Sequence, residues 1–286
     1  MTNEDLALIT LSPAKISNFQ TEVYSQYKLL HRKFPWRETL NPYHILVSEF
    51  MLQQTQTDRV LPKYLKFISH FPTIHTLAEA PFQDVLAYWH GLGYNRRALF
   101  LHRTARILSD DFNSIIPTDP NQLQELPGIG PYTAHAVSTF AFNNPHVFIE
   151  TNIRSVFLYT FFYKRFHIPD SYILPLISQT LDRSVPRQWY WALMDYGSSI
   201  KKLYGNPNKR SRHYTKQKPF EGSDRQARGR ILRTLTAKGK TKRTDIAKSL
   251  HIPAIRYEKI IADLELEGFI VCEGEILTLS HGTPKT

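Results

Sequence analysis

The order of apolar and polar residues follows a helical period over most of the chain. Between Ala14 and about Ile200, apolar residues recur three and four positions apart, and Pro, Asn or Gly separates the segments. The clearest segments are the stretch opened by Asn41-Pro42 and residues 82–89, 96–110, 121–126, 132–142 and 189–199. Strands with clean alternation are missing from this region. We therefore predict an all-α domain of about ten helices.

The C-terminal part of the chain has a different pattern. Helical periods over residues 225–237, 241–250 and 254–267 precede the apolar run Phe269–Cys272, a Glu273-Gly274 turn and the alternating residues 275–279. Three helices and a hairpin predict a winged helix, in which Thr241 and Thr244-Asp245 would cap the second helix.

The third helix of this module is where a winged helix reads a nucleic-acid groove, and here it carries Arg256, Tyr257 and Lys259. An alternative stays open, because winged helices also serve as protein-interaction or packing modules. Four acids on the same helix favour that alternative, namely Glu258, Asp263, Glu265 and Glu267.

A basic connector separates the two patterns. Residues 201–218 contain seven lysines and arginines and no acid. They form either a solvated linker or a loop that contacts phosphate through Lys209, Arg210 and Arg212. We therefore expect a helical domain over 1–200, a basic connector over 201–220 and a winged helix over 221–286.

Composition narrows the range of partners. The 36 lysines and arginines exceed the 25 acids, for a net charge of +11, which favours a polyanionic partner such as nucleic acid. No apolar run approaches the length of a membrane span, and Glu4 and Asp5 stand where a secretory signal would be basic, so we expect a protein inside a cell. The single cysteine, Cys272, excludes an intramolecular disulfide and a cysteine-ligated metal centre.

Two glycines interrupt the helical pattern in the string Leu126-Pro127-Gly128-Ile129-Gly130-Pro131-Tyr132-Thr133. Gly128 and Gly130 permit backbone angles that other residues resist, so main-chain N–H groups can turn outward together. Such a nest binds phosphate, and the positive end of the following helix adds to the attraction. A helix–helix turn explains the Gly-x-Gly equally well, but the full string is far more specific. We predict a sequence-independent phosphate grip that includes Thr133.

This string resembles the helix-hairpin-helix of the endonuclease III superfamily of DNA glycosylases. The resemblance runs from about Phe34 to Gly197 and is to the MutY-type adenine glycosylases in particular. The fragments that carry it are Pro35-Trp36-Arg37, Pro42-Tyr43, Val47-Ser48-Glu49-Phe50-Met51-Leu52-Gln53-Gln54-Thr55-Gln56 and Gly91-Leu92-Gly93-Tyr94.

The resemblance implies excision of a base, which needs two acidic groups. One buried carboxyl group protonates the leaving base, and another negative group stabilises the oxocarbenium-like sugar. Glu49 lies in an apolar stretch and matches the glutamate that protonates adenine in the MutY family. For the second role the family has an aspartate followed two residues later by asparagine, and this chain has Glu150 and Asn152.

Glu150 departs from that pattern by one methylene, which moves the carboxylate by roughly an ångström where catalytic geometry tolerates about 0.5 Å. Three outcomes are open: the backbone is set back to compensate, the site handles a different substrate, or excision is lost and binding retained. Apolar Phe148 and Ile149 before it favour a buried, functional acid.

Other site residues are also implied by the resemblance. Tyr132 stands where bifunctional relatives carry the lysine that forms a Schiff base, which implies hydrolysis by water without efficient strand cleavage. Gln53 or Gln54 is expected to enter the base stack, and Tyr94 to wedge beside the base opposite the target. The expected phosphate contacts, each also explained as a solvated surface charge, are Arg37, Lys63, Arg96, Arg97 and Arg103.

Two further departures concern whole modules. Typical family members bind a [4Fe–4S] cluster through four cysteines soon after the segment that matches Ala192–Gly197, whereas the basic connector stands there in this chain. We therefore expect no cofactor and no metal. The usual C-terminal domain that checks for 8-oxoguanine opposite adenine is also missing, and the winged helix stands in its place.

We therefore predict an all-α helix-hairpin-helix DNA glycosylase domain followed by a small winged-helix (α+β) domain. The expected function is monofunctional excision of adenine mispaired with guanine or 8-oxoguanine. One alternative is a glycosylase of the same fold for uracil or thymine opposite guanine, or for a damaged purine. Another is a non-catalytic binder of damaged or mismatched DNA, or a winged-helix regulator with an old glycosylase core. The expected partner is double-stranded DNA with a mismatched or damaged base, bound by a monomer in the bacterial cytoplasm, at the nucleoid, or elsewhere inside a cell.

Overall fold

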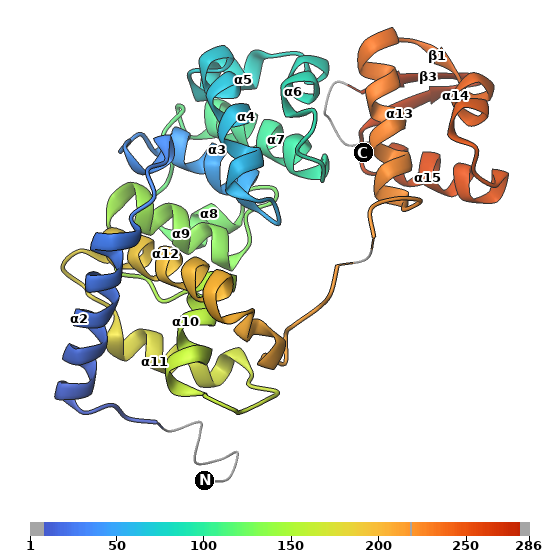
Figure 1. The fold of residues 1–286 in the computed structure, drawn as a ribbon. Coiled ribbons are helices and arrows are strands. Elements are labelled where there is room, and N and C mark those ends of the chain that lie inside the picture. The colour runs from blue at the N-terminus through green and yellow to red at the C-terminus, as the bar shows by residue number, and fades with distance from the viewer. Residues whose placement is uncertain (1–8, 218, 281–286) are drawn as a thin grey trace. The chain divides into compact units, whose positions relative to one another are not determined.

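Helices make up most of the computed structural model, which describes residues 9–217 and 219–280 (Figure 1). Glu4, Asp5 and Lys218, on which parts of the sequence interpretation rest, lie outside these residues. The chain forms two compact units that do not follow the order of the sequence. Unit 1 comprises residues 1–45, 118–121 and 129–216, and unit 2 comprises residues 46–117, 122–128 and 217–286.

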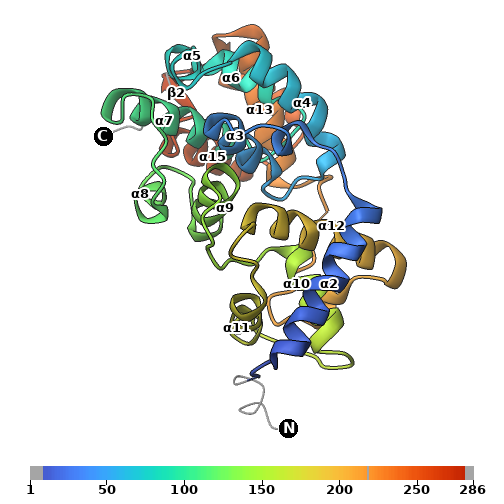
Figure 2. The ribbon, with the colours of Figure 1, turned by 90° about the vertical axis from the view of Figure 1, so that its left-hand side faces the viewer.

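Unit 1 is built from helices that enclose an aromatic core. α10 (Thr151–Phe161) and α12 (Pro186–Tyr204) pack against each other, and α2 (Pro13–Leu30) packs on α12 and on α11 (Asp170–Thr180) (Figure 2). Phe19 of α2 meets the Phe157 ring at 5.4 Å and the Trp189 ring at 5.9 Å between centroids. The same cluster of buried side chains reaches α9 (Pro131–Phe142) through Ala136 and Phe140.

A proline and a glycine mark the two ends of α12, the longest of these helices. Pro186 occupies its first turn, where no N–H is needed for the helical ladder. Gly205 ends the helix with φ +82°, a backbone angle that L side chains rarely adopt. The helix therefore has a fixed length and carries residues 189–201 past α10.

Unit 2 contains four consecutive helices, α4 (Thr57–His70), α5 (Ile74–Glu79), α6 (Phe82–Trp89) and α7 (Arg96–Asp111). α5 and α6 pack on α7, and Phe67 of α4 meets the fully buried Trp89 edge-on at 6.0 Å. α3 (Pro42–Leu52) begins in unit 1 and continues into unit 2, and α8 (Pro120–Gln124) also crosses between them.

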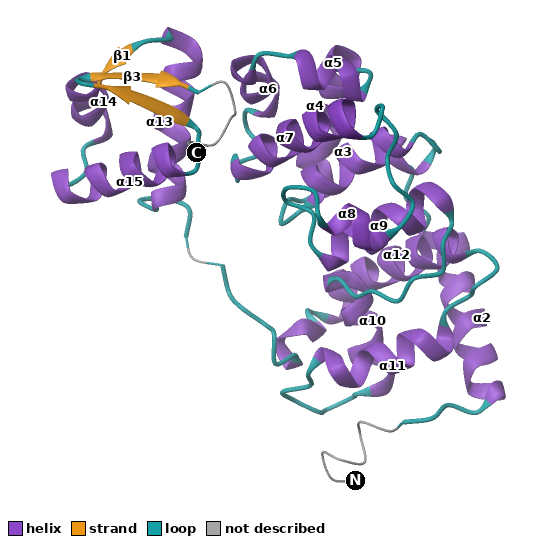
Figure 3. Cartoon of the chain, turned by 180° about the vertical axis from the view of Figure 1, so that it is seen from behind, coloured by secondary structure: helices purple, strands orange, loops and turns teal. Residues whose placement is uncertain are grey.

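The C-terminal module of unit 2 has the three helices and the hairpin expected of a winged helix (Figure 3). Its elements are α13 (Asp224–Lys238), β1 (Thr241–Lys242), α14 (Arg243–Leu250), α15 (Ala254–Leu266), β2 (Ile270–Glu273) and β3 (Ile276–Leu279). The sheet is antiparallel in the order β1-β3-β2, and Leu277 pairs with Cys272 on one side and Thr241 on the other.

β1 corrects one detail of the sequence interpretation. Thr241 was expected to cap the second helix, but it pairs with Leu277 in the sheet, and the N-cap residue is Lys242, whose side chain makes no cap hydrogen bond. A strand of two residues is too short to produce a detectable alternation.

The predicted helical segments are confirmed. α6 has the predicted bounds, and α3, α7 and α9 begin or end within a residue or two of theirs. The described helices include none with the length and apolar character that a bilayer span requires.

Candidate functional site

The glycine hairpin joins α8 to α9, and of its two glycines only Gly128 is required by the backbone and by the space around it. Gly128 has φ +78°, and a Cβ atom there would lie 2.7 Å from the Phe100 side chain, so both the backbone angle and the space select glycine. Gly130 is the N-cap residue of α9, and a Cβ there would meet nothing within 4 Å. Gly130 has φ −87°, which any residue adopts, so the expectation that both glycines supply backbone angles that other residues resist is wrong for Gly130.

Carbonyl groups of the hairpin accept hydrogen bonds from the protein, whereas three of its N–H groups do not donate to a carbonyl in the part of the chain that the structure describes. Thr104 Oγ1 donates to Pro127 O at 2.9 Å, and Gln53 Nε2 donates to Gly128 O at 3.5 Å. The N–H groups of Gly128, Ile129 and Gly130 donate to no carbonyl within the described residues. Three available donors precede the positive end of α9, and this arrangement suits an anion.

Glu49 lies on α3 and is buried, as the sequence predicted. It is 6% exposed, and its neighbours in the helix Val47, Phe50 and Met51 are fully buried. A carboxyl group in such surroundings is a candidate proton donor, since burial disfavours the charged form.

Arg97 of α7 organises the loop that follows Glu49. Its Nη1 donates to Phe50 O, Met51 O and Gln53 O at 2.6–2.9 Å, and its Nη2 donates to Thr55 Oγ1 and Gly93 O at 3.0 Å. The residue is 6% exposed, and burial lowers its pKa to about 10. Arg97 was expected to bind phosphate. Instead it caps the end of α3 and joins it to the Gly91–Tyr94 loop.

The three predicted duplex probes lie at the two ends of this Arg97 network. Gln54 is exposed with φ +54°, and Gln53 is half-buried. Tyr94 has φ +47°, and its ring lies between two guanidiniums, Arg97 at 5.5 Å and Arg225 at 5.4 Å. Arg225 Nη1 also donates to Tyr94 Oη at 2.6 Å, so α13 holds the ring from the C-terminal module.

Glu150 is the N-cap residue of α10. Its Oε1 accepts the backbone N–H groups of Asn152 at 2.6 Å and Ile153 at 2.8 Å. Its Oε2 accepts from Asn152 Nδ2 at 3.2 Å. The longer side chain thus reaches the helix start, where the dipole favours a negative charge. These hydrogen bonds hold the carboxylate in one position.

Two residues of α12 lie near this cap, and Tyr132 packs on the segment that precedes it. A Cβ on Gly197 would lie 2.1 Å from Asn152 O, so α12 approaches α10 as closely as glycine allows. Lys201, one turn further along α12, is half-buried; burial lowers its pKa, and the attraction of Glu150 opposes that shift. The Tyr132 ring packs edge-on against Phe148 at 5.8 Å. The sequence interpretation placed Lys201 in the connector. Its position four residues after Gly197 on α12 could have indicated that it lies on the helix face that meets α10.

Arg37, an expected phosphate contact in the 3-10 helix η1 (Pro35–Arg37), has internal partners. Its Nη1 and Nη2 donate to the two oxygens of Asp195 at 2.8 and 3.0 Å, and Arg32 Nε donates to the same carboxylate at 2.6 Å. The Asp195 side chain is fully buried. This triad fixes the chain before α3 against α12.

The basic connector is partly structural. In η2 (Pro207–Arg210), buried Asn208 donates to Thr151 O at 3.0 Å and Ser155 Oγ at 2.6 Å. Arg210 donates to Phe162 O and Leu158 O at 2.6 and 2.9 Å. Lys209 and Arg212 are exposed. The connector thus braces α10 at both ends, and the exposed lysines and arginines among its described residues are Lys209, Arg212, Lys202 and Lys216.

The residues present do not fit a four-cysteine iron–sulfur cluster. The chain has one cysteine, Cys272, and it lies in β2 of the C-terminal module. Within the described ranges, no group of three or more His, Cys, Asp or Glu side chains is arranged to hold a metal ion.

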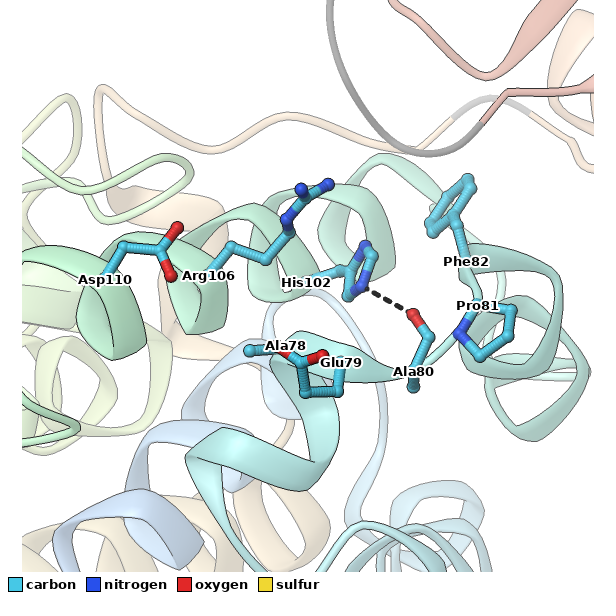
Figure 4. Close-up of a pocket in the computed structure, with 8 residues that line it drawn as sticks. All are labelled: Ala78, Glu79, Ala80, Pro81, Phe82, His102, Arg106 and Asp110. Atoms are coloured by element: carbon cyan, nitrogen blue, oxygen red, sulfur yellow. Dashed lines mark hydrogen bonds between the residues drawn. The ribbon is translucent and has the colours of Figure 1, made fainter.

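A pocket of about 410 Å³ lies apart from the predicted site residues, between the end of α5 and α7 (Figure 4). His102 forms one wall, stacks on Phe82 at 5.7 Å and contacts Ala80 O through Nε2 at 3.0 Å. A carbonyl accepts, so Nε2 carries the proton of the neutral ring. Burial lowers the pKa of His102 from 6.5 to about 4.

We expect His102 to make stability pH-dependent. Between pH 6.5 and pH 4 the unfolded chain binds a proton that the folded chain excludes, so stability is complete above pH 6.5 and falls as the pH drops. The expected loss from pH 7 to pH 5 is about 2 kcal/mol. Urea unfolding at both pH values measures it. His102→Gln replaces the ring N–H with an amide N–H donor and removes the titration, so the stability that this variant loses between pH 7 and pH 5 should be smaller by that amount. An equal loss of stability in both proteins would contradict the assignment.

Comparison with known proteins agrees with this arrangement. Residues 47–173 match the HhH-GPD superfamily of base excision DNA repair proteins. The adenine DNA glycosylase of Buchnera aphidicola subsp. Baizongia pistaciae is 38% identical over 187 residues, which cover 64% of this chain and 52% of that protein. The adenine DNA glycosylase of Mycobacterium tuberculosis H37Rv is 43% identical over 145 residues, which cover 50% of this chain and 47% of that protein. The chain thus spans about half the length of these relatives.

Solved structures share the helical fold. A thermostable thymine-DNA glycosylase superposes with a TM-score of 0.58 at 24% identity, over 65% of this chain and 87% of that one. Endonuclease III in a non-covalent complex with DNA superposes with a TM-score of 0.52 at 19% identity, over 74% of this chain and 91% of that one. At such identities the likeness concerns the fold.

Proposed function

We propose that this protein is a DNA N-glycosylase that removes adenine mispaired with guanine or 8-oxoguanine, since residues 47–173 match the HhH-GPD superfamily of base excision DNA repair proteins. The observation that carries the proposal is the buried carboxyl group of Glu49, in a chain whose curated relatives are adenine DNA glycosylases. The chain's single cysteine supports an enzyme that works without an iron–sulfur cluster.

DNA is held first through its backbone. The available N–H groups at Gly128, Ile129 and Gly130 and the start of α9 bind one phosphate without regard to base sequence. The exposed side chains of Lys209 and Arg212 add charge to a chain that already carries +11. Gln53 or Gln54 occupies the space that the flipped adenine leaves, and Tyr94 wedges beside the opposite base.

The chemistry then divides between two carboxyl groups. Glu49 donates a proton to adenine, which makes the base a better leaving group. Glu150, hydrogen-bonded at the start of α10 and to Asn152, stabilises the positive sugar until water attacks it. Tyr132 has no amine and forms no Schiff base, so the product is an intact strand with an abasic site.

We expect Glu150→Gln to slow excision about 10²- to 10³-fold with little change in DNA affinity. The amide oxygen still accepts the N–H groups of Asn152 and Ile153, so the helix stays capped, while the negative charge is lost. Single-turnover excision rates measure the effect. Glu150→Ala serves as the comparison, because it also removes the cap and should cost about 1 kcal/mol of stability. A full rate in Glu150→Gln would remove Glu150 from the mechanism.

A panel of duplexes tests the proposal as a whole. Each duplex carries one mismatch or lesion, and after incubation with the protein it is treated with or without alkali. Alkali-dependent breaks at adenine opposite guanine or 8-oxoguanine are expected. Breaks at uracil, thymine or a damaged purine instead would assign a different base to the same fold, and binding without breaks on every duplex would reject an enzyme.

A further inference from the structure

A cluster of positive side chains gathers around the turn at His90-Gly91 in unit 2. Arg59 of α4 donates through Nη2 to Gly91 O at 2.6 Å. A Cβ on Gly91 would lie 3.4 Å from Lys63 Cε and 3.6 Å from Lys63 Nζ, which places that ammonium beside the turn. Burial lowers the pKa of His90, and the nearby charges of Arg233 and Lys63 lower it further. Arg233 belongs to α13, so two segments far apart in sequence bring their charges to one place.

The C-terminal module is fixed to the helices of unit 2 by specific contacts. Glu267 at the end of α15 accepts from Arg96 Nε at 3.1 Å and from Arg228 Nη2 at 2.6 Å, and its main-chain oxygen accepts from Arg103 at 3.0 Å. Gln83 Nε2 donates to Thr236 O at 2.9 Å. Arg96 and Arg103 are thus engaged with the module, and α13 is held at α6 with Arg233 exposed.

The helix that usually reads a groove in a winged helix is occupied by contacts within its own module. Tyr257 is 3% exposed and donates to Arg243 O at 2.9 Å. Arg256 donates to Asp224 at 2.7 Å and to Gly222 O at 2.6 Å. Of the three residues expected to read a groove, only Lys259 is exposed. α13, by contrast, presents Arg230 and Arg233 to solvent.

We propose that Arg59, Lys63 and Arg233 form a phosphate-binding surface for the DNA strand that carries the base opposite the excised adenine. The proposal rests on the proposed function. The turn at Gly91 is three residues from Tyr94, the residue expected to wedge beside the opposite base, so phosphates flanking that base come within reach of this cluster. Its charges are positive and the partner is a polyanion. The C-terminal module then acts through its first helix, α13, as a second wall of the DNA-binding surface.

The test measures the salt dependence of DNA binding by the full chain. The probe is a duplex with a tetrahydrofuran abasic analogue opposite guanine, and binding is followed by fluorescence anisotropy at several KCl concentrations. The double variant Lys63→Ala, Arg233→Ala should lower the slope of log K against log salt by about 1.8, because each phosphate contact contributes about 0.9. Its affinity at moderate salt should fall about tenfold or more. A variant that is merely misfolded would lose affinity, but its slope would not fall by the amount expected for two lost phosphate contacts.

Lys242→Ala, Lys248→Ala is the matched control, since both residues are exposed in β1 and α14 of the same module. It should leave the slope unchanged. A fall in the slope of the control equal to that in the Lys63 and Arg233 variant would show that any two positive charges of the module contribute alike, and would overturn the proposal. An unchanged slope in the Lys63 and Arg233 variant would overturn it directly.

Neutral methylphosphonate linkages identify the strand. Placed beside the opposite guanine, they should weaken binding by the parent protein and have little added effect on the double variant. The same behaviour with linkages on the abasic strand alone would contradict the assignment. The outcome is separable from the proposed function: excision of adenine with an unchanged slope rejects only the phosphate surface, whereas a changed slope without excision of any base rejects only the glycosylase.

Discussion

Glu49→Gln is expected to abolish excision of adenine while the protein still binds DNA. The amide has the size of the carboxyl group but cannot donate an acidic proton, so the protonated leaving base is lost. General acid catalysis typically contributes 10²- to 10⁴-fold, and we expect a loss of about 10³-fold in the single-turnover rate. Saturating protein, a duplex with adenine opposite 8-oxoguanine and alkaline cleavage of the product measure this rate.

Glu273→Gln is the control for that substitution, because Glu273 is exposed in β2 of the C-terminal module. It should excise at the parental rate. Anisotropy with an uncleavable adenine analogue should give affinities for Glu49→Gln and the parent within about threefold of each other, since the proton matters only in the transition state. Persistence of the full rate in Glu49→Gln would reject the role of Glu49 as the acid.

Asp195→Asn is expected to lower the free energy of unfolding by about 3–5 kcal/mol, because it leaves two guanidiniums around a buried site without their negative partner. The Asp195 side chain is fully buried, and it accepts from both Arg32 and Arg37. A domain has about 5–15 kcal/mol of stability in all, so the loss is a large part of it. Urea unfolding followed by circular dichroism measures the change.

The pair Arg154–Asp170 provides a matched comparison. It is also bidentate, at 2.7 Å for both hydrogen bonds, but both side chains are partly exposed. Asp170→Asn should therefore cost only about 1 kcal/mol or less. If Asp195→Asn and Asp170→Asn lower the free energy of unfolding equally, burial of the triad does not increase its contribution to stability.

Local patterns were sufficient for the elements that frame the site. The period of three and four residues located α6, because that helix buries one face along its own length, and the apolar stretch after Asn41-Pro42 located α3, which is buried almost throughout. The glycine string identified the hairpin because Gly128 requires a positive φ and has no room for a Cβ. The burial of Glu49 followed from its apolar neighbours in α3.

The arginines could not be assigned in this way. Arg97, Arg37 and Arg210 look alike in the sequence, where each is a basic residue near an expected DNA surface. Their partners are backbone carbonyls, the Thr55 hydroxyl and a carboxylate, and most of these lie more than 40 positions away along the chain. A local pattern carries no information about such pairings. Lys201 escaped notice for the same reason, since its interaction with Glu150 arises only when α12 crosses α10.

The hydrogen bonds of Arg97 have a consequence for the proposed glycosylase. One guanidinium anchors both the loop at Gln53 and the loop at Gly93-Tyr94. If Gln53 and Tyr94 probe the duplex as proposed, the two probes are held by one shared group, so both strands would be tested together. Discrimination between paired and mispaired adenine would then begin before any base is excised, as a joint requirement on both strands.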